Sequence, residues 1–127
     1  MGSLLKTKDL EVLIIDDEKD ICYLLGSLFK GKKLDTAYVN TIKEAQNILK
    51  ITHPDVIFLD NHLPDGLGIN FIAQIKEMHP KTKVVMITAH DNPEDRDRAM
   101  QEGADYFISK PFSRESVSQT VESIILH

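Results

Sequence analysis

The chain has 127 residues, of which 42% are hydrophobic and 28% are charged, so its length and composition fit one compact globular domain and exclude a disordered chain. Its apolar runs are far shorter than the roughly 20 residues of a membrane-spanning helix, and its single cysteine excludes an internal disulfide and a thiolate metal cluster. The net charge of −5, without a stripe of Lys and Arg, argues against direct binding of nucleic acid, and we expect a soluble cytoplasmic protein.

Five apolar, β-branched runs predict five strands. In chain order they cover residues 11–15, 34–39, 55–59, 83–87 and 105–109. After each run, apolar residues recur at helical spacing and predict a helix. These helices cover residues 21–28, 42–49, 71–75, 93–103 and 117–125.

Several of these helices have recognisable ends. Asn40 or Thr41 suits the N-cap of the second helix, and Ser113 suits that of the fifth. Pro93 fits the first turn of the fourth helix, and Gly103 is a natural C-terminal end for it.

The alternation of strands and helices predicts an α/β domain over residues 11–127, with a parallel sheet covered by helices on both faces. The first, third and fourth strands are almost wholly apolar, which is typical of central strands. Residues 1–10 form an N-terminal extension whose opening "MGS" resembles an expression scar. In such sheets ligands bind beyond the carboxyl ends of the strands.

Polar residues stand at those carboxyl ends. They are Asp16, Asp17, Asp60, Thr88 and Lys110. Each alone is compatible with a helix cap or a turn, but their joint occurrence favours a common site. Three carboxylates together repel unless a cation compensates, and a few hard oxygen ligands suit Mg²⁺, with Mn²⁺ as a substitute. With a lysine and a threonine added, the set is suited to phosphoryl transfer.

The motifs "IIDDE", "DVIFLDNHLPDGLG", "VVMITAH" and "GADYFISKPF" give the chain its family resemblance. In order and spacing they resemble the receiver domain of two-component response regulators, from Glu11 to about Leu126. The resemblance implies a doubly wound, flavodoxin-like (βα)5 fold with strand order 2-1-3-4-5. It also implies a phosphoacceptor that assists its own phosphorylation and dephosphorylation, rather than an enzyme acting on free substrates.

The resemblance implies that Asp60 accepts a phosphoryl group from a phosphohistidine of a sensor histidine kinase or a histidine phosphotransfer protein. Asp17 and Asp60 would then bind Mg²⁺ directly and Asp16 through water. The backbone carbonyl of His62 would complete the protein ligands. A downstream protein target or effector domain would read the phosphorylated state.

For the remaining motif residues the resemblance implies a switch. Lys110 contacts the phosphoryl group, and a cis peptide bond precedes Pro111. Thr88 turns its hydroxyl to the phosphate, joined by the backbone N–H of Ala89, and Phe107 rotates inward. The fourth helix, fifth strand and fifth helix form the readout face. A core aromatic at a strand end is the competing interpretation of Phe107.

Two histidines flank the predicted site. We hypothesise that His62 and His90 help to set the lifetime of the aspartyl phosphate, with a pH dependence near neutrality; the alternative is two loop histidines without a special role. The segment "LPDGLG" predicts a turn into the third helix in which Gly66 and Gly68 supply flexibility.

A Mg²⁺-dependent phosphatase with an Asp nucleophile is the main alternative function. Such haloacid-dehalogenase-like enzymes carry a second Asp two residues after the nucleophile, where this chain has His62 after Asp60. A flavodoxin is disfavoured because the acidic "DDEKD" segment would repel a phosphate. The sequence leaves open whether the receiver stands alone or belongs to a longer regulator.

Overall fold

The structure is a computed structural model that describes residues 10–30 and 34–126. The opening "MGS" and the rest of residues 1–9 lie outside the described part, so the extension stays a prediction. Its last residue, Leu10, already belongs to the first strand, one residue before the predicted boundary. Within the described ranges, no helix combines the length and apolar character needed to cross a bilayer.

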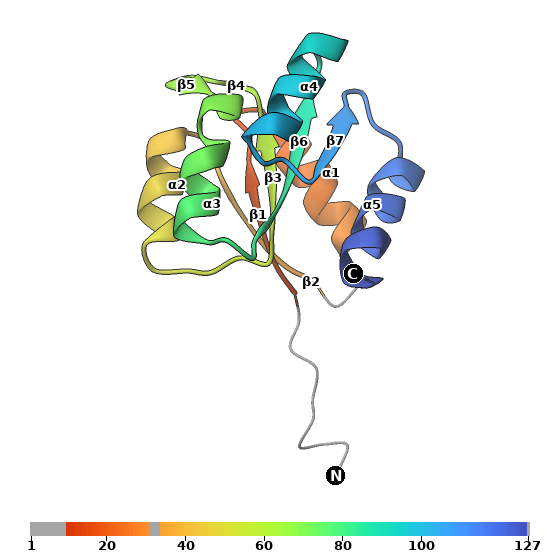
Figure 1. Cartoon of the computed structure of the whole chain (residues 1–127). Helices are drawn as coiled ribbons and strands as arrows, with labels where there is room; N and C mark the ends of the chain where they lie inside the picture. The colour runs from red at the N-terminus through yellow and green to blue at the C-terminus, as the bar shows by residue number, and fades with distance from the viewer. Residues whose placement is uncertain (1–9, 31–33, 127) are drawn as a thin grey trace.

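A five-stranded parallel sheet forms the centre of the domain. Its strands are β1 (Leu10–Ile15), β2 (Leu34–Val39), β3 (Val56–Asp60), β6 (Lys83–Thr88) and β7 (Tyr106–Ser109). The spatial order β2-β1-β3-β6-β7 confirms the predicted order 2-1-3-4-5. All five carboxyl ends therefore meet at one edge, which is at the top of Figure 1.

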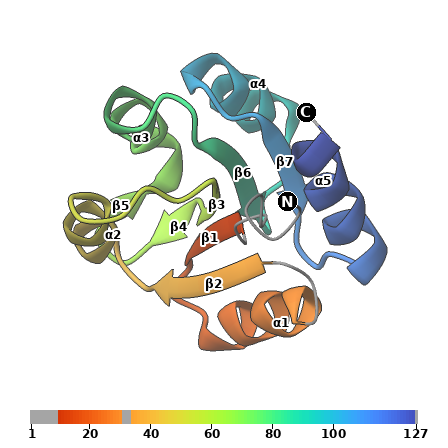
Figure 2. The same cartoon turned by 90° about the horizontal axis from the view of Figure 1, so that it is seen from below.

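Helices cover both faces of the sheet, as predicted. They are α1 (Lys19–Phe29), α2 (Ile42–Leu49), α3 (Ile72–Met78), α4 (Pro93–Glu102) and α5 (Arg114–Leu126). Helices α1 and α5 lie on one face, and α2, α3 and α4 lie on the other (Figure 2). Each face has its own apolar core because alternate residues of the central strands point to opposite sides.

The predicted helix ends are largely confirmed. Thr41 Oγ1 accepts a hydrogen bond from the Glu44 N–H at 3.0 Å, and Ser113 Oγ accepts one from the Ser116 N–H at 3.0 Å. Pro93 lies in the first turn of α4, and Gly103 ends that helix with φ 116°. The N-cap of α4, which the sequence analysis did not assign, is Asn92.

The segment after β3 is more ordered than the predicted flexible turn. Strands β4 (His62–Leu63) and β5 (Gly66–Leu67) form a short antiparallel hairpin, and a 3₁₀ turn η2 (Gly68–Asn70) leads into α3. A Cβ atom at Gly68 would lie 2.2 Å from the Asp60 carbonyl oxygen. The role of Gly68 is therefore to permit a close backbone approach, not to supply flexibility.

Candidate functional site

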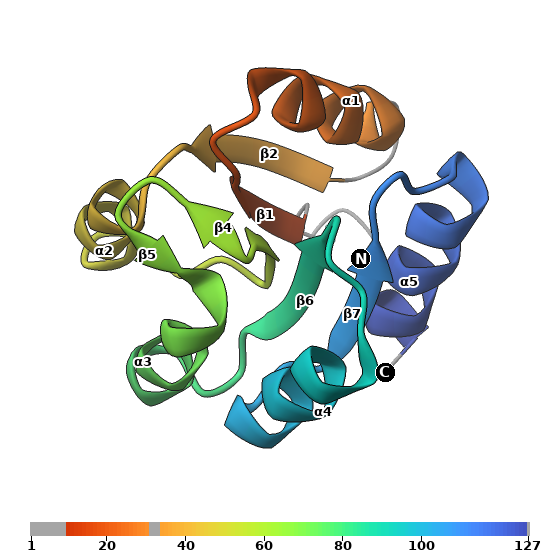
Figure 3. The same cartoon turned by 90° about the horizontal axis from the view of Figure 1, so that it is seen from above.

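The carboxyl edge of the sheet brings the five predicted residues together. Asp16 and Asp17 follow β1, Asp60 and Thr88 end β3 and β6, and Lys110 follows β7. Figure 3 looks onto this edge, with the β4–β5 hairpin beside the ends of the central strands. Carboxylate oxygens of the three aspartates all lie within 4.8 Å of one another, so the predicted acidic cluster is present.

Lys110 is the positive charge at the centre of this cluster. Its Nζ lies 2.8 Å from Asp16 Oδ2 and 3.3 Å from Asp60 Oδ1. It also lies 3.0 Å from Glu18 Oε1, a contact that the sequence did not predict. Both aspartates are buried, with Asp16 fully inaccessible and Asp60 4% exposed, whereas Asp17 is exposed.

Burial and mutual repulsion set the protonation of the cluster. Burial, followed by the charge of Asp16, raises the pKa of Asp60 from 3.8 to about 6. Burial also raises the pKa of Asp16, although its contacts with Lys110 and the Glu18 N–H oppose that rise. Burial alone would lower the pKa of Lys110, but its acidic partners outweigh burial and raise it.

The cluster fits a hard divalent cation. Among the described residues, buried Asp16 Oδ2 has no hydrogen-bond donor and is approached by Lys110 only as an ion pair. The Lys110 ammonium group pairs with the carboxylates of Asp16, Glu18 and Asp60. Asp17 adds a further carboxylate to the cluster, so negative charge is in excess. Mg²⁺ prefers a few oxygen ligands and keeps several of its waters. The carboxylate oxygens of this cluster, of which Asp17 is exposed to solvent, therefore suit it.

Backbone contacts hold the loop that carries Asp16. Its N–H donates to the Val39 carbonyl at 3.1 Å, and its carbonyl accepts from Asn40 Nδ2 at 2.8 Å. Its Oδ1 accepts from the Glu18 N–H at 2.9 Å. The acidic loop is thus tied to the segment between β2 and α2.

Thr88 is buried at the end of β6, and its hydroxyl lies against its own loop. Thr88 Oγ1 accepts a hydrogen bond from the His90 N–H at 3.1 Å, and the Thr88 carbonyl accepts from the Lys110 N–H at 2.7 Å. The Lys110–Pro111 peptide bond is cis, as the family resemblance implied. The hydrogen bond between the Lys110 N–H and the Thr88 carbonyl thus joins the two residues directly.

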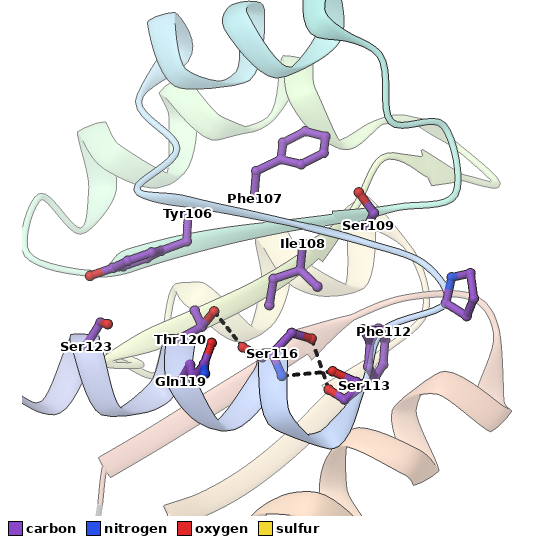
Figure 4. A pocket seen from close by; sticks show the side chains of 11 residues that line it. Tyr106, Phe107, Ile108, Ser109, Phe112, Ser113, Ser116, Gln119, Thr120 and Ser123 are labelled. Atoms are coloured by element: carbon purple, nitrogen blue, oxygen red, sulfur yellow. Dashed lines mark hydrogen bonds between the residues drawn. The ribbon is translucent and has the colours of Figure 1, made fainter.

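Phe107 lies half-buried on β7 and points toward α4, whereas Tyr106 and Ile108 point toward α5 (Figure 4). The guanidinium group of Arg96 in α4 lies over the Phe107 ring, 4.6 Å from its centroid. Sequence periodicity gave no sign of this contact.

The Arg96 side chain is held in turn by the loop after Thr88. Its Nη2 donates to both carboxylate oxygens of Asp91, at 2.8 and 3.0 Å. Asp91 also accepts from the Ser109 hydroxyl, and these bonds lower the pKa of Asp91, with the Ser109 contact contributing most. The loop after β6, helix α4 and strand β7 are therefore joined around Phe107.

A groove of about 610 Å³ runs between β7 and α5 (Figure 4). Hydroxyl and amide side chains of α5 and the preceding loop line its floor: Ser113, Ser116, Gln119, Thr120 and Ser123. It lies within the readout face predicted from the family resemblance, and β7 residues 106–109 line its other side.

The two candidate lifetime residues face each other. His62 and His90 are both exposed, and their ring centroids are 4.5 Å apart with an interplanar angle of 58°. They come from the segments after β3 and β6, which pair in the sheet. The structure thus brings together two histidines that lie 28 positions apart in the sequence.

Comparison with known proteins places this site in a family. The family model described as "Response regulator receiver domain" matches residues 12–122, and the chain belongs to that family. It is 39% identical over 101 residues to the response regulator protein PilR of Pseudomonas aeruginosa, and 33% identical over 116 residues to the phosphate regulon transcriptional regulatory protein PhoB of Escherichia coli. The beryllofluoride-activated NtrC4 receiver domain has 35% identity and a TM-score of 0.85, with 90% of this chain and 94% of that chain covered.

The matched region is only part of the longer regulators. The PilR match covers 80% of this chain and 23% of PilR, and the PhoB match covers 90% of this chain and 51% of PhoB. The chain is therefore a receiver domain of two-component signal transduction, a class that partners with histidine kinases or phosphotransfer proteins.

Proposed function

We propose that this receiver domain accepts a phosphoryl group on Asp60 from a phosphohistidine of a sensor histidine kinase or a histidine phosphotransfer protein. A carboxylate oxygen of Asp60 attacks phosphorus, the P–N bond to the donor imidazole breaks, and the electron pair of that bond stays with the imidazole. The product is an aspartyl phosphate.

The contact between Asp60 and Lys110, which lies between Asp60 and Asp16, carries the proposal. Asp60 stands at the end of a central strand, buried but bordered by an open edge, with Lys110 Nζ 3.3 Å from its Oδ1. Lys110 is placed to hold a phosphoryl oxygen beside the attacking carboxylate, which favours the transfer through charge and orientation. At neutral pH most of Asp60 is ionised because its pKa is about 6.

In this proposal Asp17 and Asp60 hold Mg²⁺ directly, Asp16 holds it through water, and the backbone carbonyl of His62 completes the protein ligands. Mn²⁺ is the expected substitute because it also favours oxygen ligands. The bound ion would neutralise charge on the carboxylates and on the incoming phosphoryl oxygens.

The structural change would begin at Thr88. On phosphorylation its hydroxyl leaves the His90 N–H and turns toward the phosphate, with the Ala89 N–H as a second donor. Movement of this loop would give Phe107 room to rotate inward and would change the α4–β7–α5 face. A downstream protein target or an effector domain would read that face.

The histidine pair would control access to the phosphorylated site. His62 and His90 lie in the two segments that border Asp60 and Thr88, so we propose that they slow the attack of water on the aspartyl phosphate.

In this proposal the receiver domain, which includes Leu10 as the first residue of β1, acts in the cytoplasm. The NtrC4 receiver domain is known in a beryllofluoride-activated form, and we propose that this chain responds in the same way at Asp60.

Incubation with acetyl phosphate and Mg²⁺, followed by intact mass measurement, tests the proposal. We expect one labile phosphate in the native chain and none in Asp60→Asn. Steady turnover of phosphomonoesters would instead indicate a Mg²⁺-dependent phosphatase with an Asp nucleophile. Omission of Mg²⁺ should suppress labelling.

A further inference from the structure

The first turn of α2 and the residue before its N-cap contact the two loops that carry the predicted cation ligands. On one side, Asn40, just before the helix, donates through Nδ2 to the Asp16 carbonyl at 2.8 Å. On the other side, the Ile42 and Lys43 N–H groups donate to the two carboxylate oxygens of Asp65, at 2.9 and 3.0 Å. Asp65 lies in the turn of the β4–β5 hairpin, 22 residues beyond Lys43.

The hairpin is held at its base as well as at its tip. At the base, the Gly68 N–H donates to the Asn61 carbonyl at 2.8 Å, and the Ile69 N–H donates to Asn61 Oδ1 at 3.0 Å. At the tip, a Cβ atom on Gly66 would lie 3.0 Å from Ile42 Cδ1, so the turn packs closely on α2. His62, whose carbonyl is a predicted ligand, lies between these two anchors.

Asp65 is not needed as the ordinary cap of α2. Thr41 already serves as the N-cap through its bond from the Glu44 N–H. Glu44 Oε1 also accepts from the Asn40 N–H at 3.0 Å, at the residue just before this cap, and from the Thr41 hydroxyl at 3.2 Å. Asp65 satisfies two further N–H groups, and its negative charge is favourable at the positive end of the helix.

We propose that Asp65 is a positioning residue for the divalent cation. By fixing the hairpin to α2 it holds the His62 carbonyl in register with Asp16 and Asp17, whose loop Asn40 ties to the same helix turn. The inference rests on the proposed function, because it assumes that the acidic cluster and the His62 carbonyl bind Mg²⁺. It adds a residue that touches neither the ion nor the phosphoryl group.

Asp65 would act by restricting the movement of the His62 carbonyl, the predicted ligand in the hairpin. Two charge-assisted hydrogen bonds limit the positions of the hairpin tip. Without them the His62 carbonyl samples more positions, and binding of the ion must order it again. Loss of an outer partner of a metal ligand lowers affinity by about 10- to 100-fold, and we expect the lower end here because the anchor acts through the backbone.

Isothermal titration of Mg²⁺ into the full chain tests the proposal with three variants. We expect Asp65→Ala to raise the Mg²⁺ dissociation constant by about tenfold. Asp65→Asn, which keeps one acceptor oxygen, should give a smaller increase. Thr41→Ala is the matched control, because it removes a cap of the same helix and leaves the hairpin contact intact; its dissociation constant should equal that of the native chain.

Amide NMR spectra show whether each variant is folded. The possible outcomes distinguish failure of the inference from failure of the proposed function. An unchanged dissociation constant in folded Asp65→Ala would overturn the inference, as would an equal weakening in Thr41→Ala, which would point to helix stability alone. If the native chain bound no Mg²⁺, or if Asp60→Asn bound it as tightly as the native chain, the proposed function itself would fail and the inference with it.

Discussion

At Asp60 the stability of the fold and the proposed function place opposite demands on one carboxylate. Its carboxylate is buried beside Asp16, and its pKa of about 6 is well above the ordinary value of 3.8. The folded protein therefore binds a proton at Asp60 more tightly than the unfolded chain does. Ionised Asp60 opposes folding above about pH 6, and this penalty disappears as the pH falls below about 4.

Asp60→Asn should therefore stabilise the metal-free protein at pH 7.5. The shift from 3.8 to about 6 corresponds to an increase of about 1–3 kcal/mol in the free energy of unfolding. Urea unfolding followed by circular dichroism measures it, and the gain should be largely absent at pH 4. Asp97→Asn, which changes an exposed aspartate on α4, should have little effect at either pH. A destabilised Asp60→Asn protein at pH 7.5 would contradict the electrostatic account.

The histidine pair gives a second prediction at the residue scale. Replacing both His62 and His90 with alanine should expose the aspartyl phosphate to water and speed its loss by at least about threefold, or about 0.7 kcal/mol in activation free energy. The rate is followed by intact mass after removal of the phosphodonor, from pH 6 to pH 8. An unchanged rate and pH profile would mean that these are ordinary loop histidines.

At the scale of elements, the Arg96 side chain joins α4 to β7, because it lies over Phe107, the predicted switch residue. Arg96 covers Phe107 and is fixed by Asp91, which lies three residues after Thr88. A movement of Thr88 toward a phosphate would pull on the loop containing Asp91. Through Arg96 and Asp91, this arrangement links the loop after Thr88 to the Phe107 ring.

Arg96→Ala should release this restraint and favour the activated packing. A cation–π contact of about 0.5–1 kcal/mol limits the shift, so we expect phosphorylation by acetyl phosphate to accelerate about two- to fivefold. Arg98→Ala is a matched control on the same helix, because the Arg98 side chain bonds to Asn70 and not to the switch aromatic. Equal rates in both variants and the native protein would show that Arg96 does not restrain the switch.

Local sequence patterns predicted the elements well because each depends on near neighbours. The range 34–39 for β2 matches the structure, and the Thr41 and Ser113 caps are present as bonds three residues long. What the sequence missed are contacts between distant residues. Glu18 reaches Lys110 across 92 positions, and Asp65 reaches Ile42 across 23.

The same distinction, between local patterns and contacts of distant residues, explains which parts of the site could be predicted. The approach of Asp16, Asp60 and Lys110 followed from placing polar residues at the ends of parallel strands, because topology alone brings strand ends together. The Arg96–Asp91 pair and the β4–β5 hairpin depend on side-chain and turn geometry, which neither periodicity nor residue type encodes. In the sequence alone, each of these residues is typical of an ordinary loop or of an exposed helix surface.

At the scale of the whole molecule, the two cores lie on opposite faces of the sheet, and the acidic cluster lies at the carboxyl ends of its central strands. Buried residues such as Ile14 and Ile57 stabilise the fold without contributing to the site. The cluster itself concentrates negative charge at the ends of the central strands. Binding of a cation should therefore stabilise the entire domain, because the unfolded chain has no preformed cluster.

Mg²⁺ at about ten times its dissociation constant should raise the free energy of unfolding by about 1.4 kcal/mol. For a domain of this size the melting temperature should rise by roughly 4–6 °C, measured by calorimetry at pH 7.5. Asp17→Asn should lose most of this rise, because an exposed ligand is removed while the buried Asp16–Lys110 pair stays intact. Asp20→Asn, an exposed acid in the first turn of α1, should keep it. A similar rise in both variants would place the stabilising cation away from the acidic cluster.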